Sequence, residues 1–153
     1  MECVIGIKMN DFVLLAADMR CAHSILTLKH DERKMYKFSN RVLAAVCGES
    51  GDTSHFAEYI QQNMQLYEIR NVIYCVRQVP FAVHGYGSMV ALSILDRMHR
   101  PDMTVTEAVE LLRSCIQEVQ KRLVINLDRY MVRIVTKDGI EELPDLTDFA
   151  VKA

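Results

Sequence analysis

Short apolar blocks separated by polar turn residues dominate the first third of the chain. Asn10-Asp11 and Ser39-Asn40 are turn signals, and each separates two apolar runs that are too short for a helix. Tight strand–turn–strand units of this kind predict antiparallel hairpins. A polar connection through Asp18, Arg20 and His23 follows the first pair of apolar runs. Residues 25–28 extend this connection. The predicted strands are residues 3–7, 12–17, 35–38 and 41–47.

The pattern then changes to a helical period over residues 52–69. Apolar residues recur at helical spacing and predict one buried stripe. Ser50 or Asp52 is placed to cap the free amides at the start of this helix. The residues of the predicted stripe are Phe56, Ile60, Met64 and Tyr67.

Two more helices are predicted in the second half of the chain. Residues 72–83 are apolar and extended, and Pro80 interrupts them. A glycine-containing corner at residues 84–88 then opens a helix that runs to about residue 99 and is stopped by Pro101.

The strongest helical pattern follows. Thr104 and Glu107 have the spacing of a capping box, which predicts a helix from there to about Leu123. Basic residues near its end complement the helix dipole. Its predicted buried face is Val105, Ala108, Val109, Leu112, Ile116 and Val119.

The chain ends in a predicted hairpin. Residues 131–135 form one strand, residues 137–139 the turn and residues 140–143 the return strand, with a loose tail from Pro144. The order of hairpins, helix, strand, two helices and hairpin is not the βαβ alternation of a doubly wound sheet. It favours an α+β fold with antiparallel sheet packed against helices.

Composition restricts the class of protein further. With 153 residues, 50% hydrophobic and 25% charged, the chain fits a single globular domain over residues 1–153. A net charge of -2 argues against a nucleic-acid-binding module. We expect no secretory signal at the start and no membrane-spanning run.

Spacing alone singles out no reactive group. The five cysteines are widely spaced without a C-x-x-C motif, so reduced thiols in a cytosolic or nuclear protein are expected, with no disulfides and no metal site. The histidines lack metal-ligand spacing, although a Cys–His nucleophile pair that meets only in space stays open. Asp11, Asp18 and Glu49 are interpreted as solvated loop acids. The corner at residues 84–88 is interpreted as a turn that needs a glycine with positive φ.

Several strings in a fixed order carry more information than any single residue. In the first half they are VIGI, VLLAADMR, KMYKF and GESGD; in the second half they are FAVHGYGS, SILDR, AVELLRSCIQEVQKRL and VRIVTKDGI. Together they resemble the β subunits of the proteasome, from Met1 to about Leu143. The resemblance implies a four-layer αββα sandwich, the fold of the N-terminal-nucleophile hydrolases.

In active members of that family a terminal threonine attacks the peptide bond, and a lysine held by an aspartate supports it. The resemblance places Asp18 and Lys34 at these two supporting positions, and Glu2 at the position of the threonine. No threonine occurs among residues 1–26. The supporting serine of the family's corner is replaced by Tyr86. We therefore expect no catalytic residue, and we interpret Asp18 and Lys34 as a structural ion pair.

A second departure is one of length. In the family, a helix and two strands lie between the first long helix and the string PFAVHGYG, whereas here only eight residues lie between Asn71 and Pro80. We therefore expect the sandwich to be incomplete between residues 71 and 80.

The resemblance implies a non-catalytic structural β subunit of the twenty-S proteasome core. Such a subunit contributes to ring assembly and to the chamber for ubiquitin-dependent protein degradation. Its implied partners are proteasome α and β subunits and assembly chaperones, with no nucleic acid, membrane or cofactor, in the cytoplasm and nucleus. Two alternatives stay open: a shortened isoform that does not assemble, and a stand-alone thiol or threonine hydrolase.

Overall fold

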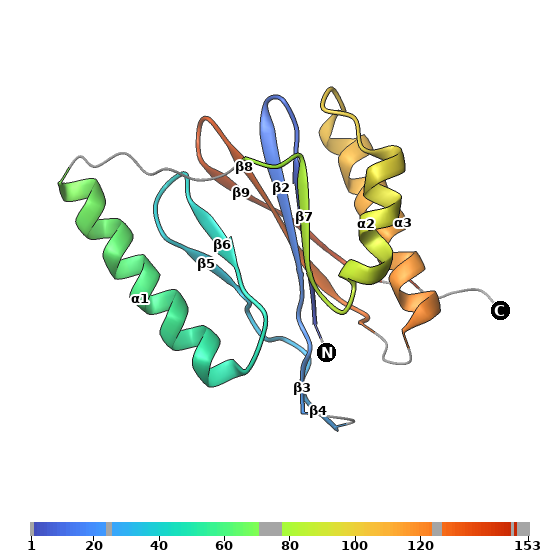
Figure 1. Cartoon of the computed structure of the whole chain (residues 1–153), viewed down its shortest axis with the longest axis horizontal. Helices are drawn as coiled ribbons and strands as arrows, with labels where there is room; N and C mark the ends of the chain where they lie inside the picture. The colour runs from blue at the N-terminus through green and yellow to red at the C-terminus, as the bar shows by residue number, and fades with distance from the viewer. Residues whose placement is uncertain (1, 24–25, 71–77, 124–126, 148, 150–153) are drawn as a thin grey trace.

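The computed structural model describes residues 2–23, 26–70, 78–123, 127–147 and 149. Antiparallel strands and three helices make up this part of the chain (Figure 1). In chain order the elements are β1 (Cys3–Lys8), β2 (Phe12–Asp18), β3 (Cys21–His23), β4 (Leu26–Lys29), β5 (Met35–Lys37), β6 (Leu43–Ala45), α1 (Ser50–Ile69), β7 (Phe81–Gly85), α2 (Ser88–Met98), α3 (Val105–Arg122), β8 (Tyr130–Thr136) and β9 (Ile140–Leu146).

The main sheet has the strand order β7-β1-β2-β8-β9 within the described residues, and each neighbouring pair is antiparallel. The hairpin of β1 and β2 pairs Ile5 with Ala16 and Ile7 with Leu14. The predicted hairpins at the start, in the middle and at the end of the chain are therefore confirmed. Because antiparallel hairpin strands run in opposite directions, the start of β1 lies beside the end of β2, which positions the site described below.

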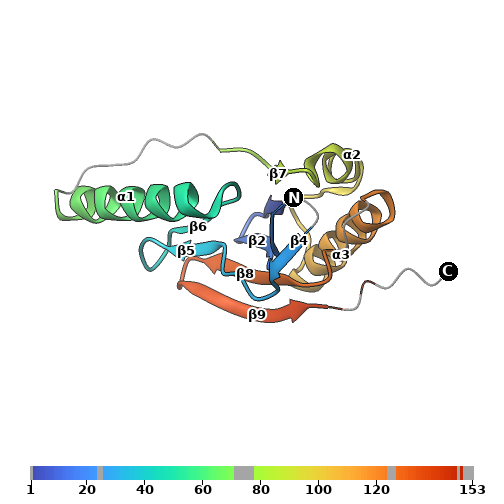
Figure 2. The ribbon, with the colours of Figure 1, turned by 90° about the horizontal axis from the view of Figure 1, so that it is seen from below.

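Helices α2 and α3 cover one face of this sheet (Figure 2). Side chains from β1, β2 and β8 meet those of the two helices in the largest buried cluster, which includes Ile5, Leu95, Leu112, Ile116 and Tyr130. The capping box of α3 is present, with Thr104 and Glu107 bonded to each other in both directions. Most of the predicted buried face of α3 is confirmed, but Val105, the first residue of the helix, is exposed.

The other face of the sheet is covered by the hairpin of β5 and β6, and α1 lies outside that hairpin (Figure 1). A small cluster of Val4, Ala17, Met19, Met35 and Met131 joins the two layers. The order of layers is helix, hairpin, five-stranded sheet and two helices. The predicted α+β class and the αββα sandwich are confirmed, with a second sheet much smaller than the first among the described residues.

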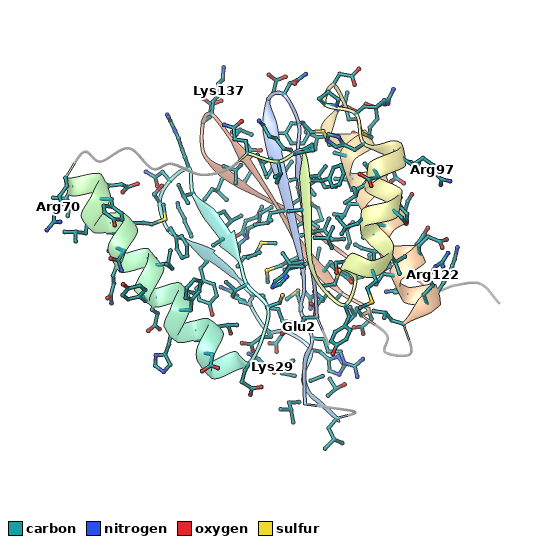
Figure 3. All side chains as sticks on the ribbon, in the orientation of Figure 1. Glu2, Lys29, Arg70, Arg97, Arg122 and Lys137 are labelled. Carbon is teal, nitrogen blue, oxygen red and sulfur yellow. The ribbon has the colours of Figure 1, made fainter. Side chains whose placement is uncertain are left out.

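Helix α1 packs only loosely. Ala57 is its one buried residue among those with described side chains, whereas Phe56 is 60% exposed and Tyr59 is 63% exposed. Side chains project from α1 into solvent in Figure 3. The predicted helix is thus confirmed, but its predicted buried stripe is wrong at Phe56 and Tyr67, because the hairpin beneath the helix is too small to cover them.

Three further sequence predictions are corrected by the structure. Helix α1 begins at Ser50 with Glu49 as its N-cap, and no side chain makes the cap bond. The connection after Asp18 contains a strand, β3, which pairs with β4. The predicted loose tail instead continues β9 to Leu146, because Pro144 is tolerated on an edge strand.

The predicted extended segment at 72–77 lies outside the described residues. None of the described helices is both long and apolar enough to span a membrane.

Candidate functional site

Three charged side chains meet at one end of the main sheet. Glu2 immediately precedes β1, Asp18 is the last residue of β2, and Lys34 immediately precedes β5. Antiparallel pairing of β1 with β2 brings the first two together, since Val4 lies opposite Ala17. The return of the chain through β3 and β4 then brings Lys34 to the same point.

Asp18 is completely buried and accepts hydrogen bonds from several donors. Its Oδ1 accepts from the backbone N–H of Cys3 at 2.8 Å, and its Oδ2 accepts from the backbone N–H of Arg20 at 3.1 Å. Lys34 Nζ lies 2.7 Å from the same Oδ2. Burial raises the pKa of Asp18, while Lys34 and the two N–H groups oppose that rise. The carboxyl is therefore a well-satisfied structural group.

The ammonium group of Lys34 is also fully used. A lysine has three N–H donors. Lys34 is 5% exposed and contacts Asp18, the backbone oxygen of Arg20 at 2.7 Å and Glu2 Oε1 at 3.1 Å. These three partners match the three donors. A reacting group added to the site would have to displace one of them.

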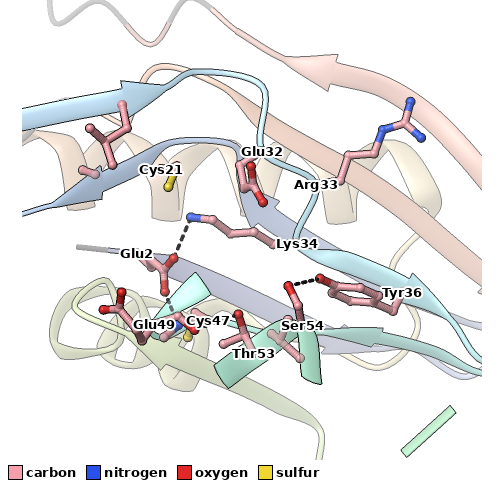
Figure 4. Close-up of a pocket in the computed structure, with 14 residues that line it drawn as sticks. Glu2, Cys21, Glu32, Arg33, Lys34, Tyr36, Cys47, Glu49, Thr53 and Ser54 are labelled. Carbon is pink, nitrogen blue, oxygen red and sulfur yellow. Dashed lines mark hydrogen bonds and ion pairs between the residues drawn. The ribbon is translucent and has the colours of Figure 1, made fainter. Parts of the chain in front are cut away.

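Glu2 closes the site toward solvent. One of its carboxylate oxygens pairs with Lys34, and the other accepts a hydrogen bond from the backbone N–H of Gly48 (Figure 4). Gly48 lies just before α1 and has a φ of 140°, which favours glycine. Glu2 therefore ties the start of β1 both to Lys34 and to the segment that leads into α1.

A pocket of about 110 Å³ opens beside these residues. Glu2, Lys34, Cys21 and Cys47 line it together with Thr53 and other residues shown in Figure 4. The Thr53 hydroxyl donates to the backbone oxygen of Glu49 at 3.1 Å. Among the residues that the structure describes, no three His, Cys, Asp or Glu side chains gather in a way that would hold a metal ion.

The glycine corner between β7 and α2 packs directly against the start of β1. Gly85 has a φ of 85°, and a Cβ there would lie 2.3 Å from the backbone oxygen of Glu2. A Cβ at Gly87 would lie 2.1 Å from Cys3 Sγ. The Tyr86 N–H donates to the Glu2 backbone oxygen at 2.9 Å, and the Tyr86 side chain is exposed. The predicted turn with a positive-φ glycine is confirmed.

Burial favours the protonated form of three described thiols, Cys3, Cys47 and Cys115. Burial raises the pKa of Cys3 to about 12, and burial raises the pKa of Cys115 to about 12 as well. Burial is the main cause that raises the pKa of Cys47, and the Glu2 carboxylate raises it further. Cys47 and His84 line a second pocket of about 440 Å³. A nucleophilic cysteine needs a lowered pKa, so these environments are the opposite of what thiol catalysis requires.

The sequence singled out part of this arrangement. The interpretation of Asp18 as a solvated loop acid is wrong, because β2 extends one residue further and places Asp18 under β1; Asp11 and Glu49 are exposed as expected. The contact of Lys34 with Asp18 agrees with the ion pair that the resemblance implied. Sequence reasoning missed the N–H groups of Cys3 and Gly48. For the Gly48 N–H, the only signal in the sequence was the presence of a glycine just before the predicted helix.

Comparison with known proteins fits this geometry. Residues 1–75 and 73–135 match the family described as "Proteasome subunit". The chain belongs to the proteasome subunit family. Its similar relatives include proteasome subunit beta type-2-B of Arabidopsis thaliana, at 34% identity over 93% of this chain and 95% of the relative. Proteasome subunit beta type-2 of Oryza sativa subsp. japonica is 33% identical over 93% and 89%. Proteasome subunit beta type-4 of Saccharomyces cerevisiae is 32% identical over 95% and 98%.

The comparisons also confirm that the chain is short in its middle. The alignment with the Arabidopsis relative spans 189 residues, whereas 93% of the 153 residues of this chain is about 142. About 47 alignment positions, the difference between 189 and 142, therefore have no residue of this chain opposite them. The family match breaks into two stretches that meet at residues 73–75, directly after α1. This is the place where the sequence predicted an incomplete sandwich.

Proposed function

We propose that this chain is a non-catalytic structural β subunit of the twenty-S proteasome core. It contributes to ring assembly and to the wall of the chamber for ubiquitin-dependent protein degradation. The observation that carries the proposal is the bonding of Lys34, whose three N–H donors are matched by Asp18, Glu2 and the Arg20 backbone oxygen.

The chemistry of residue 2 supports the absence of catalysis. Acyl transfer by the family's mechanism needs a hydroxyl nucleophile that an adjacent group activates. Here the group at the mouth of the site is a carboxylate, which is already paired with Lys34 and with the Gly48 N–H. A carboxylate held in this way contributes to neutralising the lysine and occupies one of its three donors.

The alternative of a stand-alone thiol or threonine hydrolase receives less support. Burial raises the pKa of Cys3, Cys47 and Cys115. The pocket threonine, Thr53, uses its hydroxyl to bond the α1 backbone. Neither arrangement resembles an activated nucleophile.

The proposed partners are proteasome α and β subunits, with assembly chaperones acting transiently. The proposed location is the cytoplasm and nucleus. Family membership supports assembly with other proteasome subunits, and the names of the relatives place them among β subunits.

A second candidate function is favoured by one specific observation. The chain lacks about 47 positions that its Arabidopsis relative has, and the helix beside the break is largely exposed. These features support a shortened isoform that does not enter the particle.

One experiment separates these possibilities. The tagged chain is expressed in eukaryotic cells, and the extract is separated by size exclusion. Elution with the large particle, in stoichiometric amount and without labelling by a threonine- or thiol-reactive active-site probe, is the expected result. Labelling of any residue of this chain would overturn the non-catalytic proposal. Elution only as a small species would favour the non-assembling isoform.

A further inference from the structure

The two faces of the main sheet are packed with different kinds of side chain. Toward α2 and α3, the largest buried cluster has nineteen members among the described residues, and Met9 is its single methionine. Toward the hairpin of β5 and β6, three of the five buried members are methionines. We call these three residues, Met19, Met35 and Met131, the methionine pad. Thioether side chains are therefore concentrated in the layer between the main sheet and the hairpin.

The methionine pad connects segments that are distant in the sequence. Met19 directly follows β2, and Met131 lies in β8, where it pairs with Ala17 of β2. Met35 is the first residue of β5 and belongs to the hairpin. The pad therefore forms a large part of the apolar contact between the two layers, and a chemical change in it acts directly on that contact.

The cover over the methionine pad is thin. Strands β5 and β6 have three residues each, and Leu43 and Ala45, which pack on the pad, are partly exposed. Each methionine of the pad keeps 6–7% of its surface exposed, whereas Met9 keeps 2%. A segment with few buried contacts opens locally at a lower free energy than the whole domain. A small solute can therefore reach the pad without global unfolding.

The chemistry open to a thioether at this place is oxidation by a peroxide. The sulfur lone pair attacks one oxygen of hydrogen peroxide and the O–O bond breaks. The sulfur keeps that oxygen as a sulfoxide, and the other oxygen leaves as water with both hydrogens. A sulfoxide is polar, and a buried polar group without a hydrogen-bond donor is unfavourable. Lys34, directly before Met35, offers no spare donor, because its three N–H groups are already matched.

We propose that the methionine pad is an oxidation site, and that its conversion to sulfoxide by a peroxide releases β5, β6 and α1 from the main sheet. The side packed by α2 and α3 stays intact. The release is reversible, because methionine sulfoxide reductases return the sulfoxide to the thioether. The inference does not depend on the proposed function, because it concerns how the layers of the chain itself are held together.

The test exposes the full chain to hydrogen peroxide over a time series. A thiol reductant is then added, because it reverses disulfides and sulfenic acids but leaves sulfoxides in place. Peptide mapping locates each sulfoxide, hydrogen exchange reports on each element, and thermal melting reports on stability.

The methionines outside the pad provide internal references. Met89 is 82% exposed and should be oxidised first, with no effect on melting or exchange. The methionine pad should follow while Met9 stays reduced. Exchange should then become faster in α1, β5 and β6 but not in α2 and α3, and the melting temperature should fall by roughly 5 °C.

Two sets of variants separate the pad from general oxidation. Met19→Leu, Met35→Leu and Met131→Leu together remove the sulfur atoms at nearly constant volume, so this triple variant should keep its melting temperature after peroxide. Met89→Leu with Met98→Leu is the matched control. It removes two exposed methionines and should respond to peroxide as the parent chain does. Treatment of the oxidised parent chain with the reductases should restore both melting and exchange, which tests the pad without any substitution.

Oxidation of the pad only together with Met9 would overturn the proposal, because access would then require global unfolding. Unchanged melting and exchange after the pad is oxidised would also overturn it. The same holds for a fall in melting temperature that the triple leucine variant shares, or that the reductases do not reverse.

Discussion

At the scale of single residues, the end of the main sheet depends on one buried charge pair. Asp18 has no exposed surface and Lys34 has 5%, so neither has water to replace a lost partner. Isolated buried charges are costly, and pairs of them persist only when their hydrogen bonds are satisfied. The backbone N–H of Cys3 and the backbone oxygen of Arg20 supply those bonds. The pair therefore fixes the relative position of β1, β2 and the segment before β5.

Replacing Lys34 tests this coupling. Lys34→Met leaves the Asp18 carboxyl buried without its cation, and we expect a loss of about 3–5 kcal/mol in the free energy of unfolding. Adding Asp18→Asn removes the uncompensated charge. The double variant should therefore lose at least about 1 kcal/mol less than the sum of the two single losses. Chemical denaturation of all four proteins measures the cycle, and additive losses would show that the two residues do not interact.

The buried thiols predict a pH dependence of their own. An unfolded cysteine titrates near its ordinary value of 9.0, whereas burial raises the pKa of Cys3 and of Cys115 to about 12. Between these values the unfolded state loses protons that the folded state keeps, so the unfolded state gains stability. The free energy of unfolding should accordingly be insensitive to these thiols below pH 9 and fall as pH rises toward 12.

Urea denaturation across that pH range measures the fall, and Cys115→Ala serves as the control that removes one titrating thiol. Peptide mapping after brief alkylation of the folded chain at pH 8 gives an independent check. Cys3 and Cys115 should react more slowly than Cys21, which is partly exposed at the pocket. Equal labelling of the three would contradict the protected environment of the buried thiols.

At the scale of elements, local signals and packing agree for α3 and disagree for α1. Helix α3 has a complete capping box, an acidic first turn, a basic last turn and a buried face against the sheet. Helix α1 has no side-chain cap and no basic residue in its last turn. Among the described residues, the apolar face of α1 packs against a two-stranded hairpin. This hairpin covers only part of the helix.

The capping box of α3 gives a quantitative prediction. Thr104 Oγ1 accepts from the Glu107 N–H at 3.3 Å, and the Thr104 N–H donates to the Glu107 carboxylate at 2.8 Å. Thr104→Ala removes the first of these bonds and should lower the free energy of unfolding by about 1 kcal/mol. Thr104→Ser keeps the hydroxyl and should remain within a few tenths of the parent value. Thermal melts compare the three proteins, and an equal loss in both variants would mean that the hydroxyl is not the cause.

At the scale of the whole molecule, the missing length determines which surfaces are covered. One face of the main sheet is complete, with α2 and α3 enclosing the largest buried cluster. The other face holds a small cluster and a helix whose aromatic side chains remain in solvent. A large side chain contributes roughly 1.5–3 kcal/mol when it is fully buried, and a domain is stable by only about 5–15 kcal/mol. Incomplete coverage on this side is therefore significant for the stability of the chain.

Restoring the segment tests that reasoning. A chimera that carries the additional positions of the Arabidopsis relative after α1 should melt at a higher temperature than the chain itself. It should also bind less of a fluorescent dye for exposed apolar surface, and enter proteasome particles more efficiently. The parent chain and the chimera are compared side by side in the same cells. Equal dye binding and equal incorporation would mean that the shortened sandwich is already a competent fold.

The sequence by itself determined the family and most of the elements, but it missed β3 and the extension of β9 to Leu146. Alternating apolar runs with turn residues between them specify hairpins through local backbone preferences, and the capping box specifies the start of α3, so neither depends on distant contacts. The ordered strings from VIGI to VRIVTKDGI indicated the family, and the eight residues between Asn71 and Pro80 indicated the missing length.

Only the tertiary structure decided which of these groups meet and which stay uncovered. The positions of Glu2, Lys34 and Gly48 in the sequence give no sign that the Glu2 carboxylate contacts both of the others. Their approach depends on strand pairing and on the path of the chain through β3 and β4. The burial of Asp18 depends on one further residue of pairing in β2. The exposure of Phe56 depends on what lies beneath α1, and helical spacing reports only that a face is apolar. Burial is a property of surfaces brought together from distant parts of the chain, so a local pattern cannot determine it.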